Sequence, residues 1–381
     1  MALRRGCAPL VARLTETSAG LLMLNLHRSS CLVAVVALTG CADQATTAPS
    51  ALANGQLPVS FCCGGGSPSP WTATKLTLPT GTWVSSTAKA INDSGVIVGI
   101  VEVATYKYRP VRWVNGTPSY LVVTTQEHWA VPNAINAGGD VAGQIQWISA
   151  NASTPVKPIR WLMPGGLPQP LSTLGWDGWA LDINNARTVV GMSRATSGGA
   201  KHAVKWSSAG TITDLNPLGA TWSQASGISD IGEIVGVASF AGVVHGWKWK
   251  VDNSQLDLGV VFNESVGDIN TNSEVVGTAL YNGVSQAVMW TPNGMKLPIA
   301  GAGSGTIGVS TSNGRRVIGV NGTDAWTSRS DPAPVKLPFP IGAGYTYPAD
   351  VNRCGSIVGH AAGGSLPIQT AVRWTKATCD P

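Results

Sequence analysis

A short phrase recurs seven times between Ile91 and Gly359, and this internal repeat constrains the fold more than any single residue does. The phrase reads Ile-Asn or a close variant, two or three turn residues, a glycine, two aliphatic residues and a second glycine. The second glycines, here called the closing glycines of repeats 1 to 7, are Gly99, Gly143, Gly191, Gly236, Gly277, Gly319 and Gly359. Their mean spacing is about 43 residues, a period typical of propeller blades.

The sequence of each repeat predicts a meander of four short strands. In repeat 3, residues 180–191, 202–206 and 212–215 are rich in β-branched and aromatic side chains and are separated by turn formers. An Asn at the first corner and a Gly three positions later, as in residues 92–95 and 352–355, predict a type I turn closed by a left-handed residue. The first two strands of each repeat should therefore form a hairpin.

The third strand has a period of two, with an apolar residue and a Trp on one face and usually Arg or Lys between them. It is seen in residues 111–113, 159–161, 204–206, 288–290 and 372–374. A Trp that recurs at one strand position is what a repeated interior requires, so we interpret these Trp as core anchors rather than ligand contacts.

The two ends of the chain predict ring closure. The chain ends just after the third-strand Trp374, without a fourth strand, whereas residues 74–78 resemble a fourth strand without predecessors. If the N-terminal strand completes the last blade, no sheet edge is left open. We therefore predict an all-β fold, a seven-bladed β-propeller of four-stranded antiparallel blades over residues 71–381, with the last blade closed by an N-terminal strand.

Several motifs together resemble the HAF-type extracellular repeat of secreted bacterial proteins, a β-propeller-like family that includes lipoproteins. They are the Ile-Asn-x-x-Gly-x-Val-Val-Gly phrase, the sequence His-Ala-Val-Lys-Trp at 202–206, and the Leu-Gly pairs at 174–175, 218–219 and 258–259. The resemblance covers about residues 71–376 and implies an architecture without an established common activity. The family's His is kept only at His202 and His245, so we expect no catalytic or metal role for it.

An export signal precedes the repeats. Residues 32–38 form an apolar run that follows His27 and Arg28 and is too short to span a membrane as a stable helix. Residues 38–41, Leu-Thr-Gly-Cys, resemble the lipobox of bacterial lipoproteins, which implies lipidation of Cys41; the alternative is an ordinary signal peptide cut near the same place. Ala42 after the Cys favours the outer membrane or cell surface. We expect a signal peptide over residues 1–40, with Met23 as the true start.

The residues that follow predict a tether. Ala, Thr, Ser, Gly and Pro dominate residues 41–70, a composition that cannot bury enough apolar surface to fold. Without residues 1–40 the chain loses four Arg and one Glu, which leaves 21 basic and 19 acidic residues. This near-neutral chain has no cationic cluster of the kind that nucleic-acid binding needs.

Aromatic residues just before the first strands are candidate ligand contacts. All seven lie in segments that join one repeat to the next: Trp83, Trp129, Trp176, Trp179, Trp222, Phe262 and Tyr345. Such side chains stack on sugars or anchor protein partners. The alternative is that they wedge between blades.

Three carboxylates occupy one position of the innermost strand, directly before Ile or Val: Asp182, Asp268 and Asp350. Ala90, Ala134 and Gly227 fill the same position elsewhere. Carboxylates around a channel can bind Ca²⁺; alternatively, they cap local backbone amides. We expect the capping role and no metal or other cofactor.

Motifs of catalysis are missing: the sequence has no His-Glu-x-x-His, phosphate loop, Gly-x-Ser-x-Gly or EF-hand. After Cys41 only His128, His202, His245 and His360 occur, at different repeat positions. We expect no catalytic residues, although a carboxylate pair for glycosidic cleavage stays open.

The cysteines predict one disulfide. With Cys41 lipidated, Cys62, Cys63, Cys354 and Cys379 remain in an oxidising compartment. We favour Cys354 with Cys379, which would staple the closing blade; the alternative joins Cys379 to Cys62 or Cys63.

Together these patterns predict a monomeric, exported, lipid-anchored propeller that binds or scaffolds at the cell envelope. Its partners would be the membrane, through the lipid, and a glycan or protein ligand, with no nucleic acid. The alternative is a polysaccharide-active lyase or hydrolase on the same fold. The sequence does not name the ligand.

Overall fold

The computed structural model describes residues 70–379 apart from 124–128, 147, 150–151, 330–333 and 367. Residues 65–381 group into one compact unit. The signal peptide, the lipidation site Cys41, Cys62, Cys63 and His128 lie outside the described residues. The described part consists of strands, turns and loops, and in it no helix is long and apolar enough to cross a bilayer.

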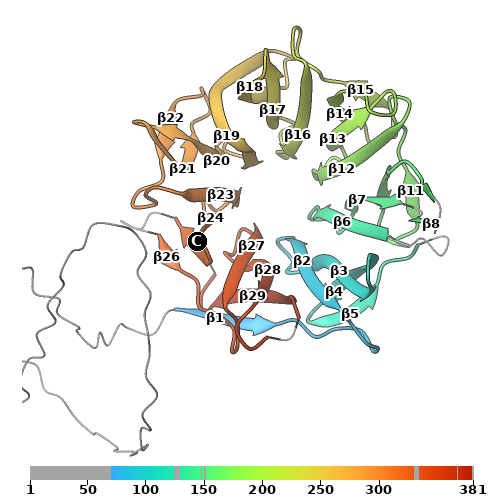
Figure 1. Ribbon diagram of the computed structural model, residues 1–381, viewed down its shortest axis with the longest axis vertical. Helices are drawn as coiled ribbons and strands as arrows, with labels where there is room; N and C mark the ends of the chain where they lie inside the picture. The colour runs from blue at the N-terminus through green and yellow to red at the C-terminus, as the bar shows by residue number, and fades with distance from the viewer. Residues whose placement is uncertain are drawn as a thin grey trace, which may run out of the picture. The chain divides into compact units, whose positions relative to one another are not determined.

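The strands form antiparallel sheets around a common axis, and the first strand of each repeat lies nearest the centre (Figure 1). Repeats 1 and 2 supply β2 (Ser85–Ile91), β3 (Ile97–Ala104), β4 (Lys107–Val114) and β5 (Thr117–Tyr120), then β6 (Trp129–Ile135), β7 (Val141–Gln146), β10 (Lys157–Trp161) and β11 (Pro168–Pro170). Repeats 3 and 4 supply β12 (Asp177–Ile183), β13 (Val189–Arg194), β14 (Lys201–Trp206) and β15 (Ile212–Asp214), then β16 (Trp222–Ile228), β17 (Ile234–Phe240), β18 (Val243–Trp249) and β19 (Gln255–Ile269). The long β19 serves repeats 4 and 5, since it pairs with both β18 and β20.

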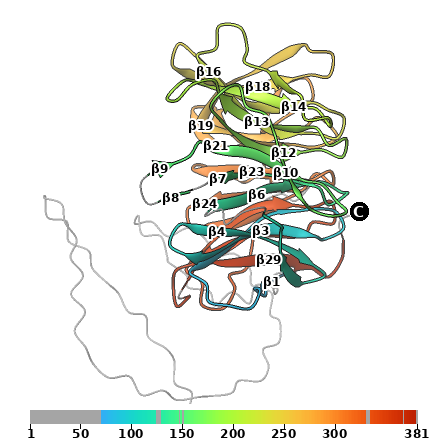
Figure 2. The same cartoon turned by 90° about the vertical axis from the view of Figure 1, so that its right-hand side faces the viewer.

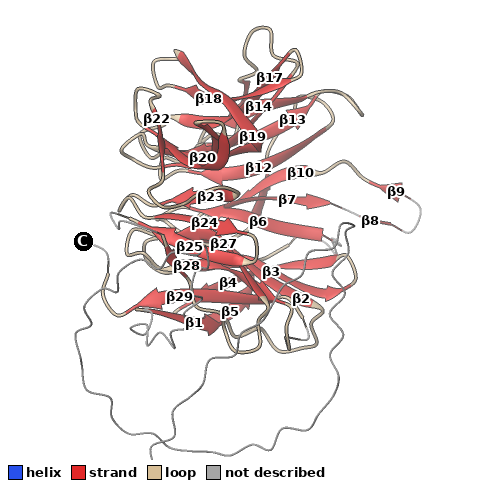
Figure 3. Cartoon of the chain, turned by 60° about the vertical axis from the view of Figure 1, so that its left-hand side comes forward, coloured by secondary structure: helices blue, strands red, loops and turns tan. Residues whose placement is uncertain are grey.

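Repeats 5 and 6 continue with β20 (Val275–Tyr281), β21 (Val284–Trp290) and β22 (Lys296–Pro298), then β23 (Thr306–Thr311), β24 (Val317–Asn321), β25 (Asp324–Ser328) and β26 (Val335–Lys336). Repeat 7 holds β27 (Tyr345–Val351), β28 (Ile357–Ala362) and β29 (Thr370–Lys376). A small hairpin of β8 (Ile148–Ser149) and β9 (Ala152–Ser153) extends away from repeat 2 (Figure 3).

The N-terminal strand β1 (Trp71–Lys75) pairs with β29, so the sheet order of repeat 7 is β1-β29-β28-β27. It begins three residues earlier than residues 74–78, where the sequence pattern predicted it. Residues 76–78 instead lead into repeat 1, because Leu76 and Leu78 pack into its core and the Thr77 carbonyl accepts a hydrogen bond from Trp113 Nε1 at 2.6 Å.

The third-strand Trp side chains form the cores between neighbouring sheets. Trp113, Trp161, Trp206, Trp290 and Trp374 are 0% exposed. Each indole N–H donates to a carbonyl near the end of the preceding repeat, as from Trp206 to Ser172 at 2.7 Å and from Trp290 to Leu258 at 2.9 Å. The recurrent Trp therefore fills the interior and ties each repeat to the one before it.

The two glycines of the repeated phrase are required for different physical reasons. Gly95 N–H donates to the Asn92 carbonyl at 2.9 Å and has a φ of 76°, a left-handed conformation that glycine adopts without steric cost. The closing Gly99 has another role, because a Cβ there would overlap the Thr87 carbonyl oxygen of the neighbouring strand.

Strand direction divides the body into two faces. Every first strand runs from an inter-repeat connection to the turn of the repeated phrase, capped by Asn or, in repeats 4 and 6, by Ser, so all of these turns lie on one face, the turn face. The inter-repeat connections and the hairpins between second and third strands lie on the other, the connection face. Figure 2 shows the strands crossing the body between the two.

Candidate functional site

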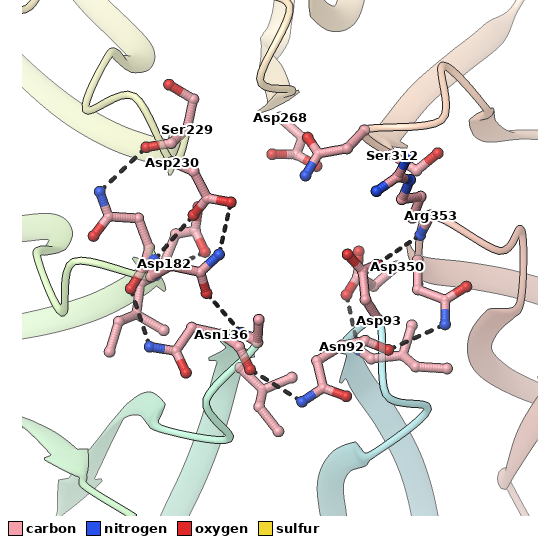
Figure 4. A pocket seen from close by; sticks show the side chains of 18 of the residues that line it. Asn92, Asp93, Asn136, Asp182, Ser229, Asp230, Asp268, Ser312, Asp350 and Arg353 are labelled. Atoms are coloured by element: carbon pink, nitrogen blue, oxygen red, sulfur yellow. Dashed lines mark hydrogen bonds between the residues drawn. The ribbon is translucent and has the colours of Figure 1, made fainter.

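The turn face is held together by the asparagines of the repeated phrase (Figure 4). Asn136 Oδ1 accepts the Asp140 N–H at 2.9 Å within its own turn, while its Nδ2 donates to the Asn184 carbonyl of the next repeat at 3.1 Å. Asn352 Nδ2 likewise reaches the Asn92 carbonyl at 3.0 Å and so joins repeat 7 to repeat 1. In repeats 4 and 6 the residue is Ser229 or Ser312, whose hydroxyl caps the turn.

A second set of bonds between repeats is made by the residues that directly follow these caps in the sequence. Asp230 accepts hydrogen bonds from Asn185 N and Nδ2, at 2.9 and 2.8 Å, and Asp93 accepts one from Arg353 N at 2.8 Å. The disulfide Cys354–Cys379 ties the turn of repeat 7 to the C-terminal segment. The disulfide predicted between these two cysteines is thereby confirmed. Together, these contacts engage most of the polar groups of the turn face within the protein.

The three central carboxylates bridge neighbouring repeats. Asp182 accepts the N–H of Ile183 and of Ile228, both at 2.7 Å, and Asp350 accepts those of Val351 and Ile91 at 2.7 and 2.8 Å. In each pair the second amide belongs to the next repeat. The backbone contacts match the capping alternative of the sequence analysis.

Asp268 and Asp350 share one hydroxyl group. Ser310 Oγ lies 2.9 Å from Asp268 Oδ2 and 3.2 Å from Asp350 Oδ1. The serine hydroxyl has one hydrogen, so it either shares this hydrogen between the two carboxylates or accepts a hydrogen bond from one of them in its protonated form. Both distances fit a protonated carboxyl group among these three side chains.

Burial supports the same conclusion. It raises the pKa of Asp182 to about 8, with the charge of Asp268 adding to the shift, and it raises the pKa of Asp268 to about 6, with the charge of Asp350 adding to it. The pKa of Asp350 is also raised by burial. These carboxyl groups line a polar cavity of about 150 Å³ that opens on the turn face (Figure 4).

The spacing and the partners of the three carboxylates bear on metal binding. Across the described part of the chain, no three or more His, Cys, Asp or Glu side chains are grouped so as to hold a metal ion. The oxygens of Asp182, Asp268 and Asp350 are instead occupied by backbone amides and Ser310.

The retained His residues have a local role. His202 Nδ1 lies 2.8 Å from Asp214 Oδ2, and His245 Nδ1 lies 2.9 Å from Asp257 Oδ2, so each His joins the third strand of its repeat to the fourth. The Asp follows its His by 12 residues in both repeats, a pattern visible in the sequence.

The predicted aromatic residues divide into two groups on the connection face. Trp176, Phe262 and Tyr345 are exposed. Trp83, Trp129, Trp179 and Trp222 are half-buried, and Trp83 packs into the core of repeat 1. The three exposed residues therefore fit the alternative of an open aromatic rim, and the four half-buried residues fit the alternative of aromatics wedged between blades.

Two of the half-buried indoles meet in one cavity. It has a volume of about 400 Å³ and lies between repeats 3 and 4. Its lining, which we call the Trp179–Trp222 slot, consists of Trp179, Met192, Arg194, Gly199, Ala200, Lys201 and Trp222. The two Trp were predicted from the sequence, whereas Met192, Arg194 and Lys201 were not, because the strand pairing that sets Trp179 opposite Met192 is seen only in the structure.

A second cluster that the sequence analysis missed lies where repeats 7 and 1 meet. The rings of Tyr347 and His360 are stacked with centroids 5.6 Å apart, and Tyr345 meets His360 edge-on at 6.3 Å. Burial and the nearby charge of Lys89 lower the pKa of His360 to about 4, so this imidazole is neutral at pH 7.

Comparisons with known proteins identify the fold. No family model matches the chain, and no curated protein matches its sequence. Virginiamycin B lyase from Staphylococcus aureus is similar in structure, with a TM-score of 0.52 and 9% identity over 80% of this chain and 98% of that chain. A streptogramin B lyase structure gives a TM-score of 0.51 and 10% identity over the same shares.

A third similar structure is TolB from Acinetobacter baumannii, with a TM-score of 0.42 and 13% identity. The match covers 58% of this chain and 55% of that chain, about half its length. Identities this low bear on the fold alone. The architecture and its structural neighbours define the chain as a β-propeller protein.

Proposed function

We propose that this protein is an exported, lipid-anchored β-propeller that binds a glycan through its connection face at the cell envelope. The single observation that carries this proposal is the distribution of exposed aromatic side chains. All six in the described part of the chain lie on the connection face or on strand ends that lead into it: Tyr106, Tyr120, Trp176, Phe262, Tyr345 and Tyr347. Exposed aromatic side chains grouped on one face are typical of binding surfaces.

Two aliphatic residues strengthen the same observation. Leu218 and Ile341 are 101% and 93% exposed, and both follow a Pro and precede Gly-Ala in corresponding inter-repeat connections. On the turn face, by contrast, hydrogen bonds between repeats occupy the loops. The connection face therefore carries the two most exposed large apolar side chains of the described residues, Leu218 and Ile341, together with the exposed aromatic ones.

The finer architecture belongs to the same proposal: seven blades, the last completed by the N-terminal strand, in a protein of the HAF-type repeat family. The pairing of β1 with β29 supports the closure, as do the bonds of Asn352 to Asn92 and of Asp350 to Ile91 between repeats 7 and 1. The seven closing glycines support the number of blades.

The binding proposal is tested by incubating the purified protein with a panel of immobilised plant and microbial cell-wall glycans. We expect retention of at least one glycan without release of reducing ends or unsaturated products. The double variant Trp176→Ala with Tyr345→Ala should lower that retention. Absence of retention across the panel contradicts glycan binding.

Lipid anchoring is tested in cells by metabolic labelling with a fatty acid. We expect labelled protein in the membrane fraction and loss of the label in the Cys41→Ser variant. A label that persists in this variant, or a wild-type protein without label, contradicts the anchor.

A second candidate function is polysaccharide cleavage, which the cluster at the junction of repeats 7 and 1 favours. A neutral His360 stacked on Tyr347 can accept a proton, and the ammonium of Lys89 can stabilise negative charge. This candidate predicts that unsaturated products appear with the same glycan panel and disappear in His360→Ala. Retention without products excludes it.

A further inference from the structure

A cavity between repeats 3 and 4, separate from the Trp179–Trp222 slot, is built around Lys205. Its volume of about 370 Å³ falls in the range of about 300–1,000 Å³ that is usual for small-molecule sites. The lining, which we call the Lys205 pocket, includes Thr188 and Lys205 of repeat 3 and Trp249 and Val251 of repeat 4. Two neighbouring repeats therefore form this pocket together.

In other repeats, the cation at the strand position of Lys205 bonds to the residue that comes four positions after the cap of the Asn or Ser turn. In repeat 4, Lys248 Nζ lies 2.8 Å from Glu233 Oε2, and the Lys248 side chain is only 1% exposed. In repeat 7, Arg373 Nη2 donates to Ser356 Oγ at 3.1 Å. The protein itself supplies an acceptor to each of these cations, and in repeat 4 that acceptor is a carboxylate.

Repeat 3 keeps the cation and lacks the acceptor. Thr188 stands where Glu233 stands in repeat 4, since the backbone N–H of each is capped four positions upstream, by Asn184 at 3.0 Å and by Ser229 at 3.1 Å. Within the described part of the chain, the half-buried Lys205 side chain forms no hydrogen bond or ion pair. An ammonium group in a cavity wall without a protein acceptor favours an anion from solution.

The other charged side chains of the lining, Asp214 and Lys250, have partners of their own. Asp214 Oδ2 lies 2.8 Å from His202 Nδ1. Asp214 also projects from the other face of the sheet than Lys205, because it pairs with the residue before Lys205. Lys250 interacts with the charge of the exposed Asp252. The charge available to a ligand in this pocket is therefore that of Lys205.

The rest of the pocket offers an apolar wall. Trp249 is 5% exposed and belongs to the core between repeats 3 and 4, whereas Val251 is 63% exposed. An apolar wall beside an unpaired cation suits an organic acid with an apolar body better than it suits an inorganic anion. The acceptor that repeat 4 uses at this place, a carboxylate, indicates the same class of ligand.

We propose that the Lys205 pocket binds a small organic carboxylate, with its carboxylate at Lys205 and its apolar body against Trp249 and Val251. The pocket reaches the turn face through Gly232 and Asn253. This second site therefore goes beyond the binding of a glycan on the connection face.

The test is calorimetric titration of the full chain with phenylacetate, 4-methylpentanoate and indole-3-acetate, each compared with its amide, which has the same apolar body without the charge. We expect at least one acid to bind at least about tenfold more tightly than its amide, the effect of losing a charge-assisted hydrogen bond. Raising the salt concentration should weaken binding of the acid and not of the amide.

Variants assign this preference to the pocket. Lys205→Met keeps an apolar stem and should bring the affinity for the acid down to that for the amide. Thr188→Glu copies Glu233 of repeat 4, so its carboxylate should pair with Lys205 and abolish binding of the acid. Thr188→Gln is the matched control, because it has the same length without the charge, and it should keep the preference for the acid.

The outcomes separate this inference from the proposed function. Failure of all three acids to bind, equal affinities for acid and amide, or a preference for the acid that survives Lys205→Met overturns it. Equal effects of Thr188→Glu and Thr188→Gln overturn it as well. The double variant Trp176→Ala with Tyr345→Ala, which should lower glycan retention, should bind the acid as the wild type does; a matching loss of acid binding would place the acid outside the Lys205 pocket.

Discussion

The two faces of this propeller use the same repeated unit in opposite ways. On the turn face, Asn136 and its counterparts cap their own turns through Oδ1 and donate through Nδ2 to a carbonyl of the next repeat. The polar groups of this face therefore form hydrogen bonds within the protein. On the connection face, the loops leave Trp176, Leu218 and Ile341 in solvent. The turn face joins neighbouring repeats, whereas the connection face carries the exposed aromatic side chains on which the proposed binding rests.

The largest difference between the faces should appear in stability. Trp290 is fully buried and its indole N–H donates to the Leu258 carbonyl, so Trp290→Ala should lower the free energy of unfolding by about 3–5 kcal/mol. Trp176→Ala on the connection face should change it by no more than about 0.5 kcal/mol. Denaturant unfolding measures both, and similar losses would contradict the assignment of Trp290 to the core and Trp176 to the surface.

An intermediate effect should come from the asparagines of the turn face. Asn184 Oδ1 accepts the Thr188 N–H at 3.0 Å and Nδ2 donates to the Ser229 carbonyl at 3.2 Å. Asn184→Ala should cost about 1–3 kcal/mol, because the buried backbone groups lose their partners. Asn184→Ser, which copies repeats 4 and 6, should keep the cap and cost less. Equal losses in the two variants would show that the bond between repeats, and not the cap, accounts for the loss.

The central carboxyl groups should make stability depend on pH. The pKa of Asp182 is raised from 3.8 in the unfolded chain to about 8, so above pH 4 the folded state holds a proton that the unfolded state has lost. The free energy of unfolding should therefore fall as the pH rises from 4 to 8, by at most about 1.4 kcal/mol per pH unit for this group. Asp182→Ala, which copies Ala90 and Ala134, should flatten the slope; a slope unchanged by this substitution would remove Asp182 as its source.

The structural features that the sequence predicted are those that depend on residues close together in the chain. The Asn turns, the closing glycines and the buried third-strand Trp follow from local sterics and a period of two, and each recurs often enough to be recognised. The Cys354–Cys379 disulfide was also predicted, because both residues belong to the last repeat.

Contacts across repeats were harder to predict. The bond from Asn136 Nδ2 to Asn184 joins residues 48 positions apart, and only the geometry of adjacent turns shows it. The Trp179–Trp222 slot combines residues whose separate patterns, an aromatic before a strand and a cation at a strand end, are common on protein surfaces. The contacts of Ser310 with Asp268 and Asp350 join three repeats at once, so no local sequence pattern predicts them.

The central claim is that the glycan is bound on the connection face, and paired charge insertions test it most directly. Leu218→Lys with Ile341→Lys places charges on the connection face, whereas Ile231→Lys with Val251→Lys places them on exposed apolar positions of the opposite face. Retention on the cell-wall glycan panel should be lost in the first double variant and kept in the second. Loss in the second with retention in the first would contradict the account.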